Sequence, residues 1–251
     1  MSIRETTSLL SKYELKAKKK YGQNFLVDKK VIDKITDCVS ENDKVVEVGP
    51  GLGALTVPLA KKAESVTAYE IDEDLVAILN EEYPFDNLTV INGDFLKEEI
   101  KEEKAVFVSN LPYYITGDIL LKCFREKDKL TKMVVMMQKE AADKFFKPKY
   151  EYGVLNVLAD YYSEYHLVCK AGKNCFIPAP NVDSAVIEFV FNEKEYDERF
   201  TEFLNACFSA RRKLLAGNLK KAGYEVKREL GNIRVEELSS EQLHELYKEC
   251  L

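Results

Sequence analysis

The chain has 251 residues, of which 46% are hydrophobic and 32% charged, and its formal net charge is −6. This composition is typical of a folded globular protein and excludes wholesale disorder, and no apolar run reaches the roughly 18 residues of a membrane span. Taken alone, the acidic balance argues against a nucleic-acid partner, because polyanions repel acidic proteins.

Short apolar runs alternate with helical stretches through most of the chain. In chain order, strands are predicted at Lys44–Val48, Ser65–Glu70, Leu88–Ile91, Ala105–Val108, Lys132–Gln138, Tyr165–Ala171 and Ser184–Phe191. Helices are predicted at Lys29–Val39, Ala54–Lys62, Glu73–Glu81, Gly117–Arg125, Lys139–Phe146 and Val154–Tyr162. Strands that alternate with helices indicate βαβ units, and therefore an α/β fold with a seven-stranded, mostly parallel sheet.

The same pattern predicts strand positions and domain boundaries. Three runs lack polar alternation, as central parallel strands do, and they are residues 45–48, 105–108 and 133–137. The last strand is interrupted by Glu188 and is therefore expected nearer an edge. After Phe191 only helical patterns follow, so we predict a first domain at 1–193 and a small helical domain at 194–251.

Charge is distributed unevenly along the chain. Residues 31–110 carry a net charge of −11, whereas residues 1–30, 111–150 and 204–228 carry +5, +4 and +6. A single charged block is usually an ordinary solvated face. If the three basic blocks meet on one face, however, they form a polyanion-binding surface in spite of the overall charge.

A glycine-rich loop follows the first predicted strand of the sheet. The strand runs into GPGLG at 49–53, and a helix is predicted to follow. Glycines let the backbone turn sharply and approach a ligand, and the helix start offers free N–H groups. Glu70 ends the next strand, 21 residues after Gly49, where a carboxylate can accept hydrogen bonds from ribose hydroxyls. This pattern predicts a nucleotide site without distinguishing NAD from S-adenosylmethionine (SAM).

Polar residues also follow the third and fourth predicted strands. Asp94 comes after the third strand and Asn110 after the fourth. Ligands of open α/β sheets bind at the carboxyl ends of the strands. We therefore expect Gly49, Glu70, Asp94 and Asn110 to rim one pocket, which is a more specific signal than any single motif.

The segment after the fourth strand reads Asn-Leu-Pro-Tyr at 110–113, and four further motifs accompany it. They are GQNFL at 22–26, EVGPGLG at 47–53, FIPAPNVDS at 176–184, and FSARRK at 208–213 with a following Asn-Leu at 218–219. In this order they resemble the ribosomal RNA adenine N6-dimethyltransferase family, specifically its bacterial small-subunit type (KsgA/RsmA type). The resemblance implies a SAM-dependent methyltransferase with a Rossmann-like sheet and a small C-terminal helical domain.

The chemistry of adenine explains the catalytic residues that this resemblance implies. Adenine N6 is a poor nucleophile, because its lone pair is delocalised into the ring. The side-chain oxygen of Asn110 and the backbone carbonyl of Pro112 can accept from the N6 hydrogens, which directs the lone pair at the methyl group. Tyr113 can stack on an extruded base, and the family's late loop offers Phe176 as the opposite face. The sulfonium of SAM is an activated donor, so no strong general base is required.

The resemblance also assigns the cofactor contacts. It implies that Asn24 and Leu26 cover SAM, that Glu70 binds the ribose and that Asp94 meets the adenine amino group. The full set of expected SAM-binding residues is Gln23, Asn24, Leu26, Gly49, Gly51, Glu70, Asp94 and Asn110. No metal is expected, because the six cysteines form no CxxC pair and neither histidine has a neighbour at metal-ligand spacing.

Basic side chains are expected to contact RNA phosphates and to position the substrate without reading its sequence. They are Lys18, Lys19, Lys20, Arg211, Arg212 and Lys213. A second basic block is formed by Lys122, Arg125, Lys127, Lys129 and Lys132. The expected partner is small-subunit rRNA in an immature 30S subunit. With no apolar signal stretch at the N-terminus and no membrane span, we expect a cytoplasmic protein, and the resemblance implies a monomer.

The leading hypothesis is dimethylation of N6 on two adjacent adenosines near the 3′ end of 16S rRNA, during 30S biogenesis. An Erm-type methylase, which modifies large-subunit 23S rRNA and confers macrolide resistance, is the nearest alternative. Leu111, the late loop and the Arg-Arg-Lys segment favour the first. A ribosome-assembly factor that binds RNA without catalysis is the alternative of a different class, although the tetrapeptide and the SAM-facing acids are intact. An NAD dehydrogenase is disfavoured, because Asn-Leu-Pro-Tyr has no role in it.

Overall fold

The computed structural model describes residues 2–15, 18, 22–146, 152–210, 212–227 and 229–251. The chain forms two compact units, the first made of residues 1–142 and 165–191 and the second of residues 143–164 and 192–251. Within the described ranges, no helix is both long enough and apolar enough to cross a membrane.

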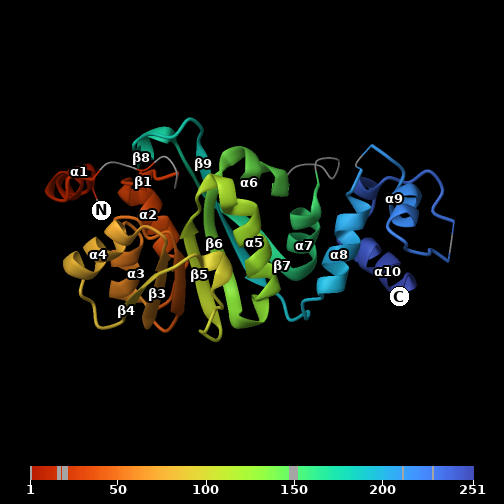
Figure 1. Cartoon of the computed structure of the whole chain (residues 1–251), viewed down its shortest axis with the longest axis horizontal. Coiled ribbons are helices and arrows are strands. Elements are labelled where there is room, and N and C mark those ends of the chain that lie inside the picture. Colours follow the sequence, from red (N-terminus) through yellow and green to blue (C-terminus); the bar gives the residue numbers. More distant parts are fainter. Residues whose placement is uncertain (1, 16–17, 19–21, 147–151, 211, 228) are drawn as a thin grey trace. The chain divides into compact units, whose positions relative to one another are not determined.

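A seven-stranded sheet forms the centre of the first unit (Figure 1). In spatial order its strands are β4 (Leu88–Asn92), β3 (Ser65–Glu70), β2 (Lys44–Val48), β5 (Ala105–Asn110), β6 (Leu130–Gln138), β9 (Ser184–Phe191) and β7 (Ser163–Ala171). The first five strands pair in parallel, and β9 is antiparallel to β6. The predicted α/β fold with a seven-stranded, mostly parallel sheet is confirmed.

Burial agrees with the central positions predicted for three strands. The apolar runs of β2, β5 and β6 are almost entirely inaccessible to solvent, as predicted for strands covered on both faces. Strand β9 lies one place from the edge, with β7 outside it. Its interrupting carboxylate, on Glu188, lies 3.0 Å from the ammonium of Lys132 on β6, so the charge is paired within the sheet.

Helices and 3-10 turns connect these strands. In the first unit they are α1 (Ile3–Lys12), α2 (Lys29–Thr36), α3 (Thr56–Lys62), α4 (Glu73–Glu82), α5 (Thr116–Arg125), η2 (Phe95–Lys97), η3 (Tyr113–Ile115), η4 (Lys127–Lys129) and η6 (Lys173–Cys175). Helix α6 (Lys139–Phe146) begins in the first unit and ends in the second. Side-chain caps set two of the starts, because Asp28 accepts from the N–H of Val31 in α2 and Asp72 from that of Asp74 in α4. Helix α2 ends at Thr36, three residues before the predicted end.

Besides the 3-10 turns, one helix and two short strands described in the first unit were not predicted. Helix α1 begins with a capping box between Ser2 and Glu5, a sequence signal that could have revealed it. Strands β1 (Phe25–Leu26) and β8 (Phe176–Ile177) pair antiparallel and lie side by side in Figure 1. Two-residue strands carry no periodicity, so only the folded chain brings them together.

The second unit is helical. It contains α7 (Val154–Tyr162), α8 (Glu198–Cys207), α9 (Leu215–Lys221), the 3-10 turn η7 (Val235–Glu237) and α10 (Ser240–Glu249). Phe200 and Phe203 of α8 are fully buried in its core. The hydroxyl of Tyr161 and Nδ1 of His244 are 2.8 Å apart, so this histidine serves packing within the unit.

The division into units differs from the expected boundary between residues 193 and 194. The chain leaves the first unit after Phe191, close to that boundary, but residues 143–164 also belong to the second unit. Helix α7, read from the sequence as part of the first domain, therefore packs with the C-terminal helices. Its apolar residues give no sign of which core they enter.

Candidate functional site

A cavity of about 250 Å³ lies at the carboxyl ends of the central strands. The loops after β2, β3, β4 and β5 line it, together with residues 22–26. The four strand-end residues Gly49, Glu70, Asp94 and Asn110 all contribute to this one cavity, as do Gln23, Asn24, Leu26, Gly51, Pro112 and Tyr113. The parallel sheet brings these residues together, since the carboxyl ends of parallel strands meet at one edge.

The glycine loop lines the cavity, and both of its glycines that do so have backbone φ angles in the left-handed region. Gly49 has a φ of 69° and Gly51 a φ of 60°, a region that residues with a Cβ rarely adopt. A Cβ on Gly51 would also lie 3.3 Å from the ring of Phe25. The loop therefore leaves room for a ligand where any larger residue would strain the backbone.

Glu70 is held by two backbone N–H groups at the end of β3. Its Oε2 accepts from the N–H of Gly51 at 3.2 Å, and its Oε1 accepts from the N–H of Asp72 at 3.0 Å. The residue is 5% exposed. Burial raises the pKa of Glu70, and the two N–H groups oppose that increase. Each oxygen keeps a further lone pair with which it can accept from a sugar hydroxyl.

Glu47 of β2 also lines the cavity and is 1% exposed. Its Oε2 has no hydrogen-bond partner among the described residues. Burial, with a smaller contribution from the carboxylate of Glu70, raises the pKa of Glu47 to about 8. A buried polar atom without a partner is costly, and one that lines a cavity is a candidate contact for a polar ligand.

Asp94 and Asn24 line the cavity from elements outside the glycine loop. Asp94 caps the 3-10 turn η2 and accepts from the N–H of Leu96 at 3.1 Å. The amide nitrogen of Asn110, the last residue of β5, donates to the backbone carbonyl of Asn24 at 3.3 Å. This bond leaves the side-chain oxygen of Asn110 available to accept from a ligand.

In the turn after β5, the carbonyl of Pro112, which was expected to accept an N6 hydrogen, is already hydrogen-bonded within the protein. The oxygen of Pro112 accepts from the N–H of Ile115 and from the hydroxyl of Thr116, each at 3.2 Å. A carbonyl oxygen has two lone pairs, so both are used. The carbonyl of Leu111, by contrast, has no partner among the described residues, and Leu111 lines the cavity.

Tyr113 is anchored at its far end. Its hydroxyl and Oγ of Ser184 on β9 are 2.9 Å apart, and Ser184 is fully buried. The serine at the end of the late loop therefore has a structural reason to be there, which the sequence alone did not reveal. The neighbouring Tyr114, left out of the expected site, lines the cavity and is 60% exposed.

Phe176 lies elsewhere. It pairs with Leu26 in the β1–β8 sheet, is 3% exposed and packs in the apolar core of the first unit. It is not among the residues that line the cavity. The role of Phe176 as the second face for the target base stays a prediction, since the structure packs its ring in the apolar core and not against the cavity.

The expected RNA contacts have different outcomes. Lys19, Lys20 and Arg211 lie outside the described residues. Arg212 and Lys213 are exposed on the second unit. The ammonium of Lys18 lies 2.7 Å from Asp72 and 2.6 Å from Asp74, so it is paired within the protein although its side chain is partly exposed.

Much of the second basic block is also paired. The ammonium of Lys122 contacts Glu126 and donates to the carbonyl of Glu98, while that of Lys132 contacts Glu188. Lys127 is 3% exposed. These lysines stabilise their own unit, and their contribution to an RNA surface is smaller than the charge count implied.

Cysteines and acids form no metal site in the described part of the chain. No group of three or more Cys, His, Asp or Glu there has the geometry to hold an ion. The six cysteines are all free thiols. For the buried Cys123, burial raises the pKa of the thiol, which disfavours the reactive thiolate.

Comparison with known proteins gives a consistent result. The chain matches the family described as ribosomal RNA adenine dimethylase over residues 14–250. It is 44% identical over 210 residues to a ribosomal RNA small subunit methyltransferase A from Mycoplasma mobile, covering 81% of this chain and 83% of that protein. A dimethyladenosine transferase from Plasmodium falciparum has the same fold, with a TM-score of 0.78, 22% identity and coverage of 88% and 95%. The 23S rRNA methyltransferase ErmE superposes with a TM-score of 0.69 at 29% identity, over 90% of this chain and 99% of that one.

Proposed function

The chain belongs to the ribosomal RNA adenine dimethylase family, and from this premise we propose that it transfers methyl groups from SAM to N6 of two adjacent adenosines near the 3′ end of 16S rRNA. The observation that carries the proposal is the cavity, where the nucleotide-binding acids lie beside the Asn-Leu-Pro-Tyr turn. A cofactor site and a base-binding turn that share one cavity are what a methyl transfer to adenine requires.

The cavity residues fit SAM. The carboxylate of Glu70 accepts from the ribose hydroxyls, and Asp94 accepts from the adenine amino group. The glycine loop passes close to the ligand at Gly49 and Gly51, where a Cβ would strain the backbone. The buried oxygen of Glu47 that has no partner among the described residues gives the ligand a further polar contact. Bound SAM supplies a methyl group on a sulfonium, an activated donor.

The protein's part in the chemistry is to orient the target nitrogen. The side-chain oxygen of Asn110 accepts one N6 hydrogen, since its amide nitrogen is held by Asn24. We assign the second acceptor to the carbonyl of Leu111, because the lone pairs of the Pro112 carbonyl are used within η3. With both hydrogens held in the first transfer, the N6 lone pair faces the methyl group, so alignment replaces a general base. The methylated nitrogen is cationic and releases one proton to water, and in the second transfer the one remaining hydrogen is held.

Aromatic rings hold the base. Tyr113 stacks on the extruded adenine, and its hydrogen bond to Ser184 fixes the ring before the base arrives. Tyr114 stands on the open side of the cavity and meets the nucleotide next to the target. Outside the cavity, exposed Arg212 and Lys213 contact phosphates.

Small-subunit RNA is the favoured substrate. The relative from Mycoplasma mobile, named for the small subunit, is 44% identical, whereas ErmE is 29% identical. Large-subunit rRNA is the second candidate, on the strength of the fold shared with ErmE. We further propose that the protein acts as a cytoplasmic monomer on immature 30S subunits, without a metal.

Labelled methyl transfer tests the proposal. Purified protein is incubated with labelled SAM and either undermethylated 30S subunits or 50S precursors. We expect label in the small-subunit rRNA, as N6,N6-dimethyladenosine at two adjacent positions. Label that enters only the large-subunit rRNA would refute the small-subunit assignment, and label in neither RNA would refute the activity.

A further inference from the structure

We propose that Asp72 is a positioning residue, through which Lys18 and Gln23 hold the N-terminal part of the cavity wall in place and set the affinity for SAM. We call the three residues Lys18, Gln23 and Asp72 the latch. The inference rests on the proposed function, since it takes the cavity as the SAM site.

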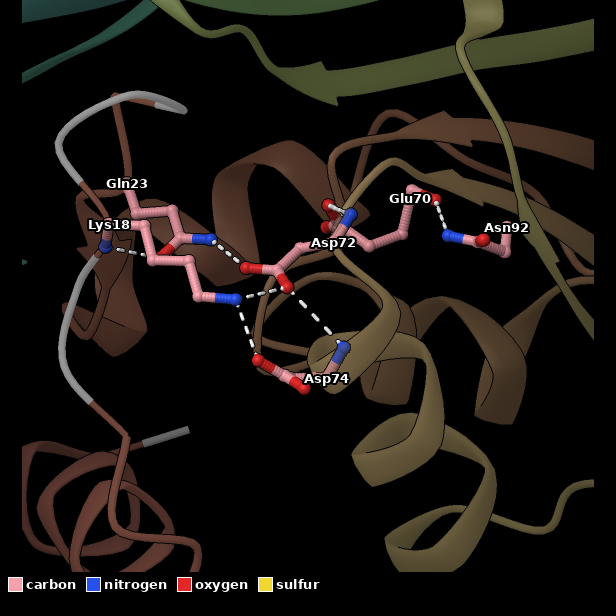
Figure 2. Close-up of polar contacts among 6 residues, drawn as sticks. All are labelled: Lys18, Gln23, Glu70, Asp72, Asp74 and Asn92. Atoms are coloured by element: carbon pink, nitrogen blue, oxygen red, sulfur yellow. Dashed lines mark hydrogen bonds and ion pairs between the residues drawn. The ribbon is translucent and has the colours of Figure 1, made fainter.

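The latch joins two distant parts of the sequence through one carboxylate (Figure 2). Oδ1 of Asp72 lies 2.7 Å from the ammonium of Lys18, and Oδ2 accepts from the side-chain amide of Gln23 at 2.9 Å. The amide oxygen of Gln23 in turn accepts from the backbone N–H of Lys18 at 2.8 Å. The three residues thus form a closed ring of hydrogen bonds across a separation of about 50 residues.

The same turn also holds the acid assigned to the ribose. Asp72 follows Glu70 by two residues, and its backbone N–H donates to Oε1 of Glu70 at 3.0 Å. Its side chain caps α4 by accepting from the N–H of Asp74. The residue that ties down Gln23 is therefore part of the short turn that orients Glu70, and the two walls of the cavity are fixed relative to each other.

Burial makes the latch strong enough to matter. The side chain of Asp72 is 4% exposed and that of Lys18 32%, whereas Asp74 is 60% exposed. Burial raises the pKa of Asp72, but the bonds from Lys18 and Gln23 outweigh it and hold that pKa below its ordinary value. A buried carboxylate that loses such donors pays for its desolvation without compensation.

The latch also gives Gln23 and Lys18 roles other than those expected from the sequence. Gln23 lines the cavity, and each end of its amide makes one bond within the latch, so the latch fixes the orientation in which this side chain meets SAM. Lys18 is bonded to Asp72 and Asp74, which leaves one of its three N–H groups for a phosphate. Asn24, the next residue along, is the one whose carbonyl accepts from Asn110.

Measurements of SAM affinity by titration calorimetry test the latch. The variants are Asp72→Asn, Lys18→Met, their combination and Lys18→Arg. Asparagine is a good helix cap, so Asp72→Asn removes the charge and keeps the start of α4. We expect each single variant to weaken SAM binding about tenfold, the effect of losing one charge-assisted hydrogen bond. We expect the double variant to bind SAM about as tightly as either single variant, because both substitutions remove the same ion pair. We expect Lys18→Arg to bind SAM nearly as tightly as the wild type.

The exposed pair Lys29 and Asp33 on α2 provides the matched control. Its charged atoms are 2.6 Å apart, and the side chains are 81% and 50% exposed. Asp33→Asn changes the net charge by the same amount as Asp72→Asn, and we expect SAM affinity within about twofold of the wild type, as for surface ion pairs. Equal SAM affinity in Asp72→Asn, Lys18→Met and Asp33→Asn would overturn the latch, as would simple additivity in the double variant.

Hydrogen exchange separates failure of the latch from failure of the proposed function. If the wild type binds no SAM, the proposed function fails. The amides of residues 22–26 in the free protein then decide the latch. Faster exchange there in Asp72→Asn than in Asp33→Asn supports it, and equal exchange refutes it.

Discussion

The carboxyl of Glu47 predicts an unusual pH dependence of stability. It lines the cavity and is 1% exposed, and burial raises its pKa from 4.5 to about 8. In the unfolded chain the same group titrates near its ordinary value. Between these two pH values the folded protein keeps a proton that the unfolded chain has lost.

The sign and size of the effect follow from this difference. Because the folded state binds more protons, the contribution of Glu47 to the free energy of unfolding is fully present below pH 4.5 and is lost as the pH rises toward 8. Each pH unit is worth about 1.4 kcal/mol. From pH 5.5 to pH 7.5 the loss is therefore about 3 kcal/mol, or roughly 6–12 °C in melting temperature for a chain of this size.

Replacing Glu47 by glutamine removes the titration while keeping the size of the side chain. Thermal unfolding of both proteins at pH 5.5 and 7.5 measures the effect, with the exposed Glu41→Gln as control. We expect the Glu47→Gln variant to gain stability relative to the wild type as the pH rises, and the control to follow the wild type. A constant difference between Glu47→Gln and wild type at both pH values would show that the carboxyl is not protonated in the folded protein.

Four other predictions concern methyl transfer and RNA binding. Asn110→Ala should reduce methyl transfer by at least about 100-fold, because positioning of the reacting atoms is lost. SAM should still stabilise this variant in a thermal shift assay, and near-normal turnover would contradict the role assigned to Asn110. Ser184→Ala removes the hydrogen bond that anchors the Tyr113 hydroxyl. We expect kcat to fall about tenfold, the effect of one hydrogen bond, with little change in SAM affinity, and an unchanged kcat would mean that the ring needs no anchor. Tyr114→Ala should raise the KM for RNA by about five- to tenfold, in keeping with the loss of one stacked base. Tyr114→Phe keeps the ring and should have a KM near that of the wild type, and equal KM values in all three proteins would exclude stacking. Replacing both Arg212 and Lys213 by alanine should reduce the salt slope of RNA binding by about two, and an unchanged slope would remove them from the RNA surface.

The sequence by itself determined the family and most of the first unit. Strict alternation of apolar strands and helices produced the seven strands to within two residues of their observed bounds, because central parallel strands leave a strong hydrophobic signal. The cavity positions could also be read from the sequence. Glu70, Asp94 and Asn110 each follow a strand, and the carboxyl ends of parallel strands meet at one edge of the sheet.

Tertiary structure decided the contacts between segments that are far apart in sequence. The ion pair of Lys18 with Asp72, the bond of Tyr113 to Ser184 and the burial of Phe176 against Leu26 leave no periodic pattern. The hydrogen bonds already made by the Pro112 carbonyl likewise led us to propose the carbonyl of Leu111 as the second acceptor for N6. Local sequence fixes which residues a strand end offers, but their partners are chosen by the packing of distant segments. The latch is the clearest case, because a lysine expected to bind phosphate is held by a buried carboxylate 54 residues away.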